Sequence, residues 1–262
     1  MESIPPTPEP SGVLPAPATS LAGRLMNVFA APGDVFSEVK TAAPSVANWL
    51  VPAILFMVLS WLSAALIFSQ PAIRQQISEL STKAIDRQVE KGKLSGAQAE
   101  QARAAAEKFG RVGSEIGAVV GPVFAAFISP FFGGLILWLV GSFALKGPFP
   151  YMKAVEVAGL SNMILALGVI VKTLLILITG NLFASTSLAL AVKDFDPQNS
   201  VHSLLTMMDV MVLWLLTVRS IGLARLSGAS VGKAALWIFG IWIAFTGAII
   251  GFGAAVRAVF GG

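Results

Sequence analysis

Residues 157–178 read VAGLSNMILALGVIVKTLLILI, and Lys172 carries the only charge in this stretch. A helix needs about 20 predominantly apolar residues to cross a bilayer. Because backbone amides find no water in hydrocarbon, such a segment must satisfy its own hydrogen bonds, which a helix does. The stretch therefore predicts a membrane-spanning helix and sets the fold class.

Four further stretches share this length and apolar character. In chain order, the five predicted spans cover residues 49–68, 116–145, 157–178, 204–226 and 234–259. The second span contains Pro122 and Pro130 and is long enough to be tilted or kinked. Period-two alternation, the sign of a transmembrane barrel, is absent. The predicted fold is all-α, a polytopic bundle of five transmembrane helices.

The composition agrees with a membrane protein. Hydrophobic residues make up 55% of the chain and charged residues only 12%, and the mean hydropathy is +0.78. An ordinary soluble domain is about 25% charged, and a soluble fold could not cover this much apolar surface. The net charge of +4 is expected to report orientation rather than nucleic-acid binding. The lipid bilayer is therefore the first expected partner.

Two segments precede the first span. Residues 1–20 are rich in proline and are predicted to be a disordered tail, because such a stretch cannot bury a core. Residues 21–48 are predicted to be amphipathic, with Leu25, Val28 and Phe29 on one helical face. This segment is expected either to lie on the membrane as an interfacial helix pair or to pack on the bundle.

Residues 71–115 are the only substantial polar segment of the membrane domain, which spans residues 49–262. Pro71 suits a helix start, Gly92 breaks that helix, and Ser95 with Gln98 forms a capping-box pattern that starts a second one. This pattern predicts a helical hairpin outside the bilayer between spans one and two. The hairpin is interpreted either as a solvated spacer or as a docking surface.

Short basic loops predict the orientation. Lys146 and Lys153 follow span two, and Arg219, Arg225 and Lys233 lie at the end of span four and in the next loop. Such loops should face the cytoplasm. The N-terminus is then cytoplasmic, and the hairpin and the C-terminus lie on the opposite side. The alanine-rich, cysteine-free composition looks bacterial, so a bacterial inner membrane is expected.

Two charges inside the predicted spans are candidate functional residues. Lys172 lies in span three and Asp209 in span four. A charge at the centre of a bilayer costs about 2.5–3.5 kcal/mol on insertion scales, so an unpaired one is rare. Both residues are predicted to lie about 9–12 Å below the same surface, and we expect an ion pair. The pair is either a structural staple or part of a solute or proton path. Asn162 is expected to form an interhelical hydrogen bond.

Small residues recur every fourth position in span two, and two glycines repeat the pattern in span five. Small side chains let helix backbones approach closely within a membrane. The pattern predicts packing inside the bundle or, alternatively, contact with a second copy of the chain. The candidate packing residues are Gly113, Gly117, Gly121, Ala125, Ser129, Gly133, Gly247 and Gly251.

Known catalytic motifs are missing from the sequence. There is no cysteine and one histidine, His202, so metal motifs such as H-E-x-x-H are ruled out. No G-x-S-x-G motif is present to support a serine nucleophile. Asp209 is the only carboxylate expected well inside a span, which argues against a two-carboxylate membrane protease. We expect no enzyme activity, no cofactor and no bound metal.

Four short motifs resemble one known family. Residues 31–36 read APGDVF, residues 208–214 MDVMVLW, residues 221–223 IGL and residues 230–234 SVGKA. Their order and spacing resemble the Yip-domain family, in its bacterial branch, over roughly residues 24–258. The motif positions are Pro32, Phe36, Asp209, Trp214, Gly222 and Lys233.

The resemblance implies a five-span protein with a cytoplasmic N-terminus. Eukaryotic members bind Rab-type GTPases and shape early secretory membranes. This chain lacks their Asp-Leu-Tyr-Gly-Pro motif, because its single tyrosine, Tyr151, stands in the sequence FPYM.

Three functions remain open at this point. The first is a non-enzymatic scaffold or adaptor with a protein partner or a second copy. The second is a small-solute or ion transporter that uses Lys172 and Asp209, and the third is a lipid-organising protein. A polar cavity reaching Asp209 would favour transport, whereas a dry bundle would favour the scaffold.

Overall fold

The computed structural model describes residues 19–193, 195–196 and 199–260, and every regular element in these residues is a helix. Within them, five helical segments are long and apolar enough to cross a membrane. These are Ala47–Ser69, Ile116–Ala144, Tyr151–Thr179, Val210–Ser227 and Val231–Gly253. The prediction of an all-α bundle with five membrane spans is therefore confirmed. The predicted tail, residues 1–20, lies almost entirely outside the described residues.

The third span begins earlier than the sequence predicted. It consists of α6 (Tyr151–Ser161) and α7 (Met163–Thr179), which follow each other directly. Asn162 joins them, and its backbone N–H donates to the carbonyl groups of Ala158 and Gly159. The helix therefore starts at Tyr151 rather than at residue 157, and it carries charged residues into the span.

The fourth span begins later than predicted. A short apolar helix, α8 (Ser200–Met207), precedes α9 (Val210–Ser227), and the chain breaks between them. Asp209 stands at the N-cap of α9, where its carboxylate accepts the N–H of Met211. Hydropathy merges the two helices because both are apolar, whereas the N-cap separates them. Asp209 therefore lies at the end of the span and not inside it.

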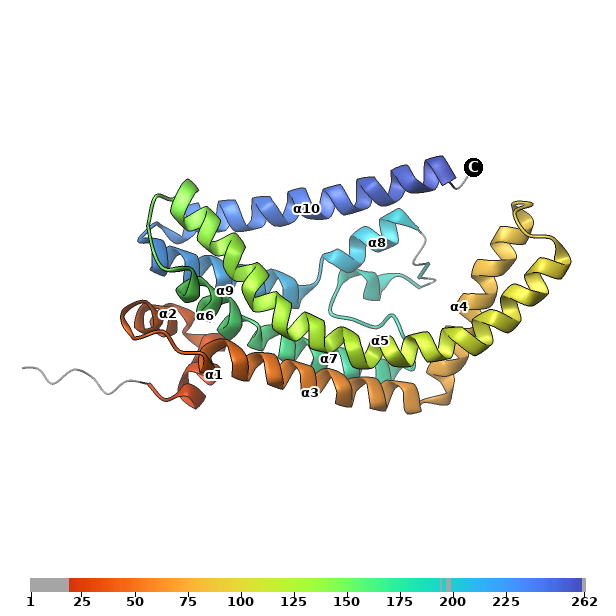
Figure 1. Ribbon diagram of the computed structural model, residues 1–262, viewed down its shortest axis with the longest axis horizontal. Helices are drawn as coiled ribbons and strands as arrows, with labels where there is room; N and C mark the ends of the chain where they lie inside the picture. The colour runs from red at the N-terminus through yellow and green to blue at the C-terminus, as the bar shows by residue number, and fades with distance from the viewer. Residues whose placement is uncertain (1–18, 194, 197–198, 261–262) are drawn as a thin grey trace, which may run out of the picture.

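The predicted hairpin is formed by α4 (Pro71–Glu90) and the first part of α5 (Gly96–Leu139). Ser95 and Gln98 close the expected capping box at the start of α5. The helix then continues without interruption into span two, so the hairpin and the membrane bundle share one helix. Figure 1 shows the hairpin standing away from the other helices.

The membrane part of α5 has two irregular features. Pro122 and Pro130 lie inside the helix, where a proline removes a backbone hydrogen bond. The helix ends in a π-helical turn, η1 (Val140–Ala144). Figure 1 shows that α5 curves along its length.

The N-terminal helices, α1 (Leu21–Ala30) and α2 (Pro32–Thr41), pack on the bundle. The side chains of Val28, Phe36 and Val39 are fully buried, in a core shared with α6 and α9. Residues 21–41 thus pack on the bundle, and their interfacial position remains a prediction.

The last helix, α10 (Val231–Phe260), packs on α9 and α8. Figure 1 shows α1, α2 and the loops before α6 and α10 at one end of the bundle. The hairpin, α8 and the end of α10 lie at the other end. The N-terminal helices and the hairpin thus lie at opposite ends of the bundle.

Candidate functional site

The N-terminal motif and the IGL motif, far apart in sequence, form one contact. Phe36 of α2 is fully buried and packs beside Gly222 of α9. A Cβ atom on Gly222 would overlap Val157 and lie 3.1 Å from Cδ2 of Phe36. Gly222 is therefore the residue that allows α2, α6 and α9 to meet at this point.

A second glycine serves the same interface. A Cβ atom on Gly33 would lie 3.0 Å from Nη2 of Arg225, so the guanidinium group of α9 covers the first turn of α2. The ring of Phe29 meets that of Trp214 edge-on, with centroids 5.8 Å apart. Residues of the motifs at 31–36 and 221–223 therefore join α2 to α9, and the contact between Phe29 and Trp214 adds α1. Lys233 does not join this contact, because its side chain is exposed on the first turn of α10.

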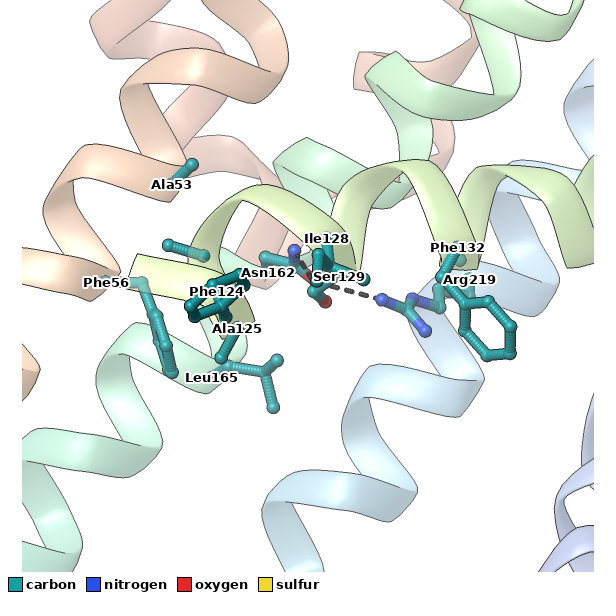
Figure 2. Close-up of a pocket in the computed structure, with 12 residues that line it drawn as sticks. Ala53, Phe56, Phe124, Ala125, Ile128, Ser129, Phe132, Asn162, Leu165 and Arg219 are labelled. Atoms are coloured by element: carbon teal, nitrogen blue, oxygen red, sulfur yellow. Dashed lines mark hydrogen bonds between the residues drawn. The ribbon is translucent and has the colours of Figure 1, made fainter. Parts of the chain in front are cut away.

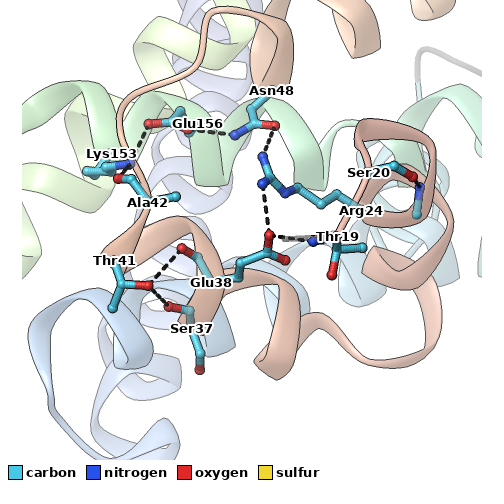
Figure 3. A network of polar contacts seen from close by, with 11 residues as sticks. Thr19, Ser20, Arg24, Ser37, Glu38, Thr41, Ala42, Asn48, Lys153 and Glu156 are labelled. Atoms are coloured by element: carbon cyan, nitrogen blue, oxygen red, sulfur yellow. Dashed lines mark hydrogen bonds and ion pairs between the residues drawn. The ribbon is translucent and has the colours of Figure 1, made fainter. Parts of the chain in front are cut away.

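A chain of polar contacts crosses the same end of the bundle (Figure 3). Arg24 pairs with Glu38 at 2.8 Å and also donates to Oδ1 of Asn48 at 3.3 Å. Asn48 donates to Oε2 of Glu156 at 2.6 Å, and Oε1 of Glu156 lies 3.1 Å from Nζ of Lys153. Four helices, α1, α2, α3 and α6, are therefore connected by contacts between polar and charged side chains.

Glu156 is the carboxylate that the sequence interpretation missed. Its side chain is 1% exposed, and it lies within the span that begins at Tyr151. The expectation that Asp209 is the only carboxylate inside a span is therefore wrong: in the five described spans the only carboxylate is that of Glu156, and Asp209 precedes the fourth span. The missed signal was the spacing, since Lys153 three residues earlier neutralises Glu156 on the same helical face. Lys153 also donates to the backbone carbonyl of Ala42 at 2.8 Å.

Glu38 is the more exposed partner of Arg24 in this chain of contacts. Its partial burial acts to raise its pKa. The hydrogen bonds from Arg24 and Thr19 and the positive charge of Arg24 outweigh that effect, so the pKa lies below its ordinary value. Glu38 therefore stays ionised at neutral pH and holds α2 to α1 through Arg24.

A second polar group lies in the middle of the bundle (Figure 2). Nη2 of Arg219 donates to Oδ1 of Asn162 at 2.9 Å, and Nδ2 of Asn162 donates to Oγ of Ser129 at 3.1 Å. The interhelical hydrogen bond predicted for Asn162 is thereby confirmed. A Cβ atom on Gly133 would lie 3.0 Å from Nη2 of Arg219, so this glycine leaves room for the guanidinium group.

Arg219 lies deep in span four rather than at its end. It follows Val210 by nine residues and precedes Ser227 by eight. At about 1.5 Å per residue, its Cα atom is about 12–14 Å from either end of the helix. The sequence interpretation grouped Arg219 with the basic residues of the following loop and therefore used it to predict the orientation. The cap at Gly228, where α9 ends, is the feature that shows its true depth.

Arg219 faces a cavity of about 360 Å³ between α3, α5, α7 and α9. Only three of the lining side chains are polar, namely Ser129, Asn162 and Arg219, and the others are apolar. A second cavity, of about 380 Å³, lies between α3 and α5. Neither cavity is lined by Asp209. The first cavity therefore combines a cation with an apolar wall inside the membrane.

The structure does not bring Lys172 and Asp209 together. Oδ1 of Asp209 accepts hydrogen bonds from Thr186 at 2.7 Å and from the N–H of Met211 at 2.8 Å. Lys172 is exposed on α7. The expected pairing is not found because Asp209 stands at a helix start, where its carboxylate satisfies donors that the helix leaves free.

The small-residue stripe has two parts with different surroundings. No atom would lie within 4 Å of a Cβ atom added at Gly113, Gly117 or Gly121, so these glycines face no neighbouring helix. The same is true of Gly247 and Gly251 in α10.

Packing within the bundle is seen only near the end of the stripe. Gly133 is buried against Arg219 and Ala158, whereas Ala125 and Ser129 line the cavity. Among the residues that the structure describes, no group of three His, Asp or Glu side chains is placed to hold a metal ion.

Comparison with known proteins agrees with this geometry. The family model described as the Yip1 domain matches residues 26–252, a range that contains every motif position from Pro32 to Lys233. No curated protein and no solved structure is significantly similar to the chain. Because the match covers most of the sequence, the chain belongs to the Yip1-domain family.

Proposed function

We propose that the chain is a non-enzymatic membrane scaffold whose docking surface is the hairpin formed by α4 and the first part of α5. The observation that carries the proposal is the extent of this hairpin beyond the candidate spans. All 20 residues of α4, and α5 as far as residue 115, lie outside them. Figure 1 shows this arm standing clear of the bundle.

The base of the hairpin is anchored to the bundle, which supports a fixed surface. Ile73 is 1% exposed and packs with Ile176 and Ala184. Gln76 donates to the carbonyl of Gly180 at 2.5 Å and accepts from the N–H of Leu182 at 3.1 Å. These contacts hold α4 in place before any partner arrives, so less conformational entropy is lost on binding.

Ion pairs stiffen the rest of the arm. Arg103 of α5 pairs with Asp86 of α4 at 2.6 Å, and Arg87 pairs with Asp196 at 3.0 Å. Beyond these contacts, charged side chains such as Glu79 and Lys83 are exposed. A rigid helical pair with a charged outer face is suited to binding a protein partner rather than to enclosing a small substrate.

Site-specific photocrosslinking in native membranes tests the docking proposal. A crosslinker at Lys83 is expected to give a discrete protein adduct, whereas the matched position Lys146, also an exposed lysine but at the other end of the bundle, is expected to give none. The adduct at Lys83 should be lost on the charge reversal Glu79→Lys. Equal labelling at both positions, or an adduct insensitive to Glu79→Lys, would contradict the proposal.

The orientation and location are further parts of this proposal. The N-terminus is placed in the cytoplasm of a bacterial cell, with the hairpin on the outer side of the inner membrane. Support comes from the basic residues Lys146, Arg225 and Lys233. They lie in or beside the loops before α6 and α10, and Figure 1 shows these loops at the end that holds α1 and α2. Because the chain has no cysteine, single substitutions report accessibility directly. An impermeant thiol reagent should label Lys91→Cys in intact cells but not Lys146→Cys.

The transport alternative depended on an ion pair between Lys172 and Asp209. Since the structure does not bring these residues together, no observation favours that alternative.

A further inference from the structure

We propose that the cavity beside Arg219 binds an anionic amphiphile from the bilayer, whose oxyanion contacts the guanidinium group while its acyl chain lies along the apolar wall. The inference goes beyond the scaffold proposed above, because it concerns a site within the spans and not the hairpin. The ligand class is defined by two chemical features of the cavity, a cation and a hydrocarbon surface.

The first feature is a cation with no anionic partner in the protein. In the part of the chain that the structure describes, none of the ion pairs involves Arg219. Its depth in α9 places the guanidinium group far from water on both sides. A buried arginine is normally paired, because removing its charge from water is costly. An anion supplied by a ligand would provide the missing partner.

The second feature is the unused hydrogen-bonding capacity of the guanidinium group. Arginine has five N–H donors, and the hydrogen bond to Asn162 uses Nη2. Nε of Arg219 is buried and has no partner. Asn162 is in turn held by Ser129, so the guanidinium group is oriented before a ligand binds. A planar donor group in this state matches a carboxylate or a phosphate, which it binds through two parallel hydrogen bonds.

The walls of the cavity indicate that the anion carries a hydrocarbon chain. Phe56, Ile128 and Leu165 line it together with Phe124 and Phe132 (Figure 2). Phe124 is 61% exposed and Phe132 55%, so the side of the cavity formed by α5 faces the lipid. A water-soluble anion would have to cross hydrocarbon to arrive here, whereas a lipid reaches the opening from within the bilayer. The volume of about 360 Å³ is at the lower end of the range for ligand pockets, roughly 300–1,000 Å³, and suits one chain.

Two membrane components share this chemistry, namely a fatty acid with its carboxylate and an anionic phospholipid with its phosphate. Native mass spectrometry of the full-length protein, delipidated in a non-ionic detergent, distinguishes them. Oleate, phosphatidylglycerol and zwitterionic phosphatidylcholine are added separately. We expect a one-to-one adduct with oleate or phosphatidylglycerol at concentrations at least tenfold below those needed for phosphatidylcholine.

Three variants connect such an adduct to the cavity. Arg219→Gln removes the cation and should weaken the adduct at least tenfold. Lys172→Gln is the matched control, since it removes a positive charge from an exposed position in span three and should leave the adduct unchanged. Ala125→Trp fills the cavity from its exposed rim, keeps the cation, and should also abolish the adduct.

The results decide the proposal in either direction. An adduct with oleate alone identifies a fatty-acid site, and an adduct with phosphatidylglycerol identifies a phospholipid site. The proposal is overturned if phosphatidylcholine binds equally well, or if no anionic lipid binds at all. It is also overturned if Arg219→Gln and Ala125→Trp bind like the wild type. Should Arg219→Gln fail to fold, Ala125→Trp alone decides. Because the hairpin is intact in every variant, the photocrosslinking at Lys83 reports on the scaffold separately.

Discussion

Replacing Glu156 by glutamine should destabilise the bundle strongly, because it leaves Lys153 as an unpaired charge in a buried position. The side chains of Lys153 and Glu156 are 6% and 1% exposed. Breaking a buried ion pair by removing one partner costs about 3–5 kcal/mol. Lys153 keeps its hydrogen bond to the carbonyl of Ala42, so we expect a value near the lower limit, about 3 kcal/mol.

The double variant makes the prediction specific to the pair. Lys153→Met alone should cost a similar amount, since it leaves the carboxylate of Glu156 with only Asn48 as a donor. With both substitutions no unpaired charge remains, so the double variant should lose less than either single variant, and far less than their sum of roughly 6 kcal/mol.

Reversible unfolding in mixed micelles with increasing denaturing detergent measures these free energies. Glu38→Gln serves as a control at the more exposed pair with Arg24, where the loss should be smaller. Strict additivity of the two substitutions at Lys153 and Glu156 would refute the reasoning, because it would show that the charges do not stabilise each other.

Three further predictions concern other contacts. Gly222→Leu should undock α1 and α2, because its side chain would occupy the space of Phe36 and Val157, and limited proteolysis between α2 and α3 should then accelerate. Folding lowers the pKa of Glu38, so this group stabilises the folded state at pH values above its ordinary pKa of 4.5. That stabilisation is lost as the pH falls through the lowered pKa. Glu38→Gln should therefore make the free energy of unfolding less sensitive to acid. Asp209→Ala should cost about 1 kcal/mol through loss of the N-cap, with Asp209→Asn retaining most of it in thermal unfolding.

The fold could be predicted from hydropathy because a span is a property of about 20 consecutive residues. The hairpin could be predicted too, since its turn rests on local chemistry at Gly92 and in the capping box of Ser95 and Gln98. The ends of the spans were less accurate. Hydropathy averages over a window, and it could not separate α8 from α9, although Asp209 marks the boundary.

The candidate site depended on those ends, which is why its charged residues were misjudged. Arg219 was assigned to the end of span four, and the predicted start of span three at residue 157 left Glu156 outside that span, whereas both residues lie within spans. Asn162 was recognised correctly because its position in span three did not depend on a boundary. The spacing of Gly113, Gly117 and Gly121 could not show which side of the helix has a neighbour, since that depends on where α5 leaves the bundle.

The continuity of α5 has a mechanical consequence. With 44 residues it is about 66 Å long, and this single helix connects the hairpin to the membrane bundle. Pro122 and Pro130 remove two backbone hydrogen bonds from α5, so the helix bends most easily at these two positions, which lie within the membrane. The cavity beside Arg219 is lined by Phe124, Ile128 and Ser129, which lie between the two prolines. A force applied to the hairpin would therefore bend α5 beside the cavity and so change the shape of the cavity.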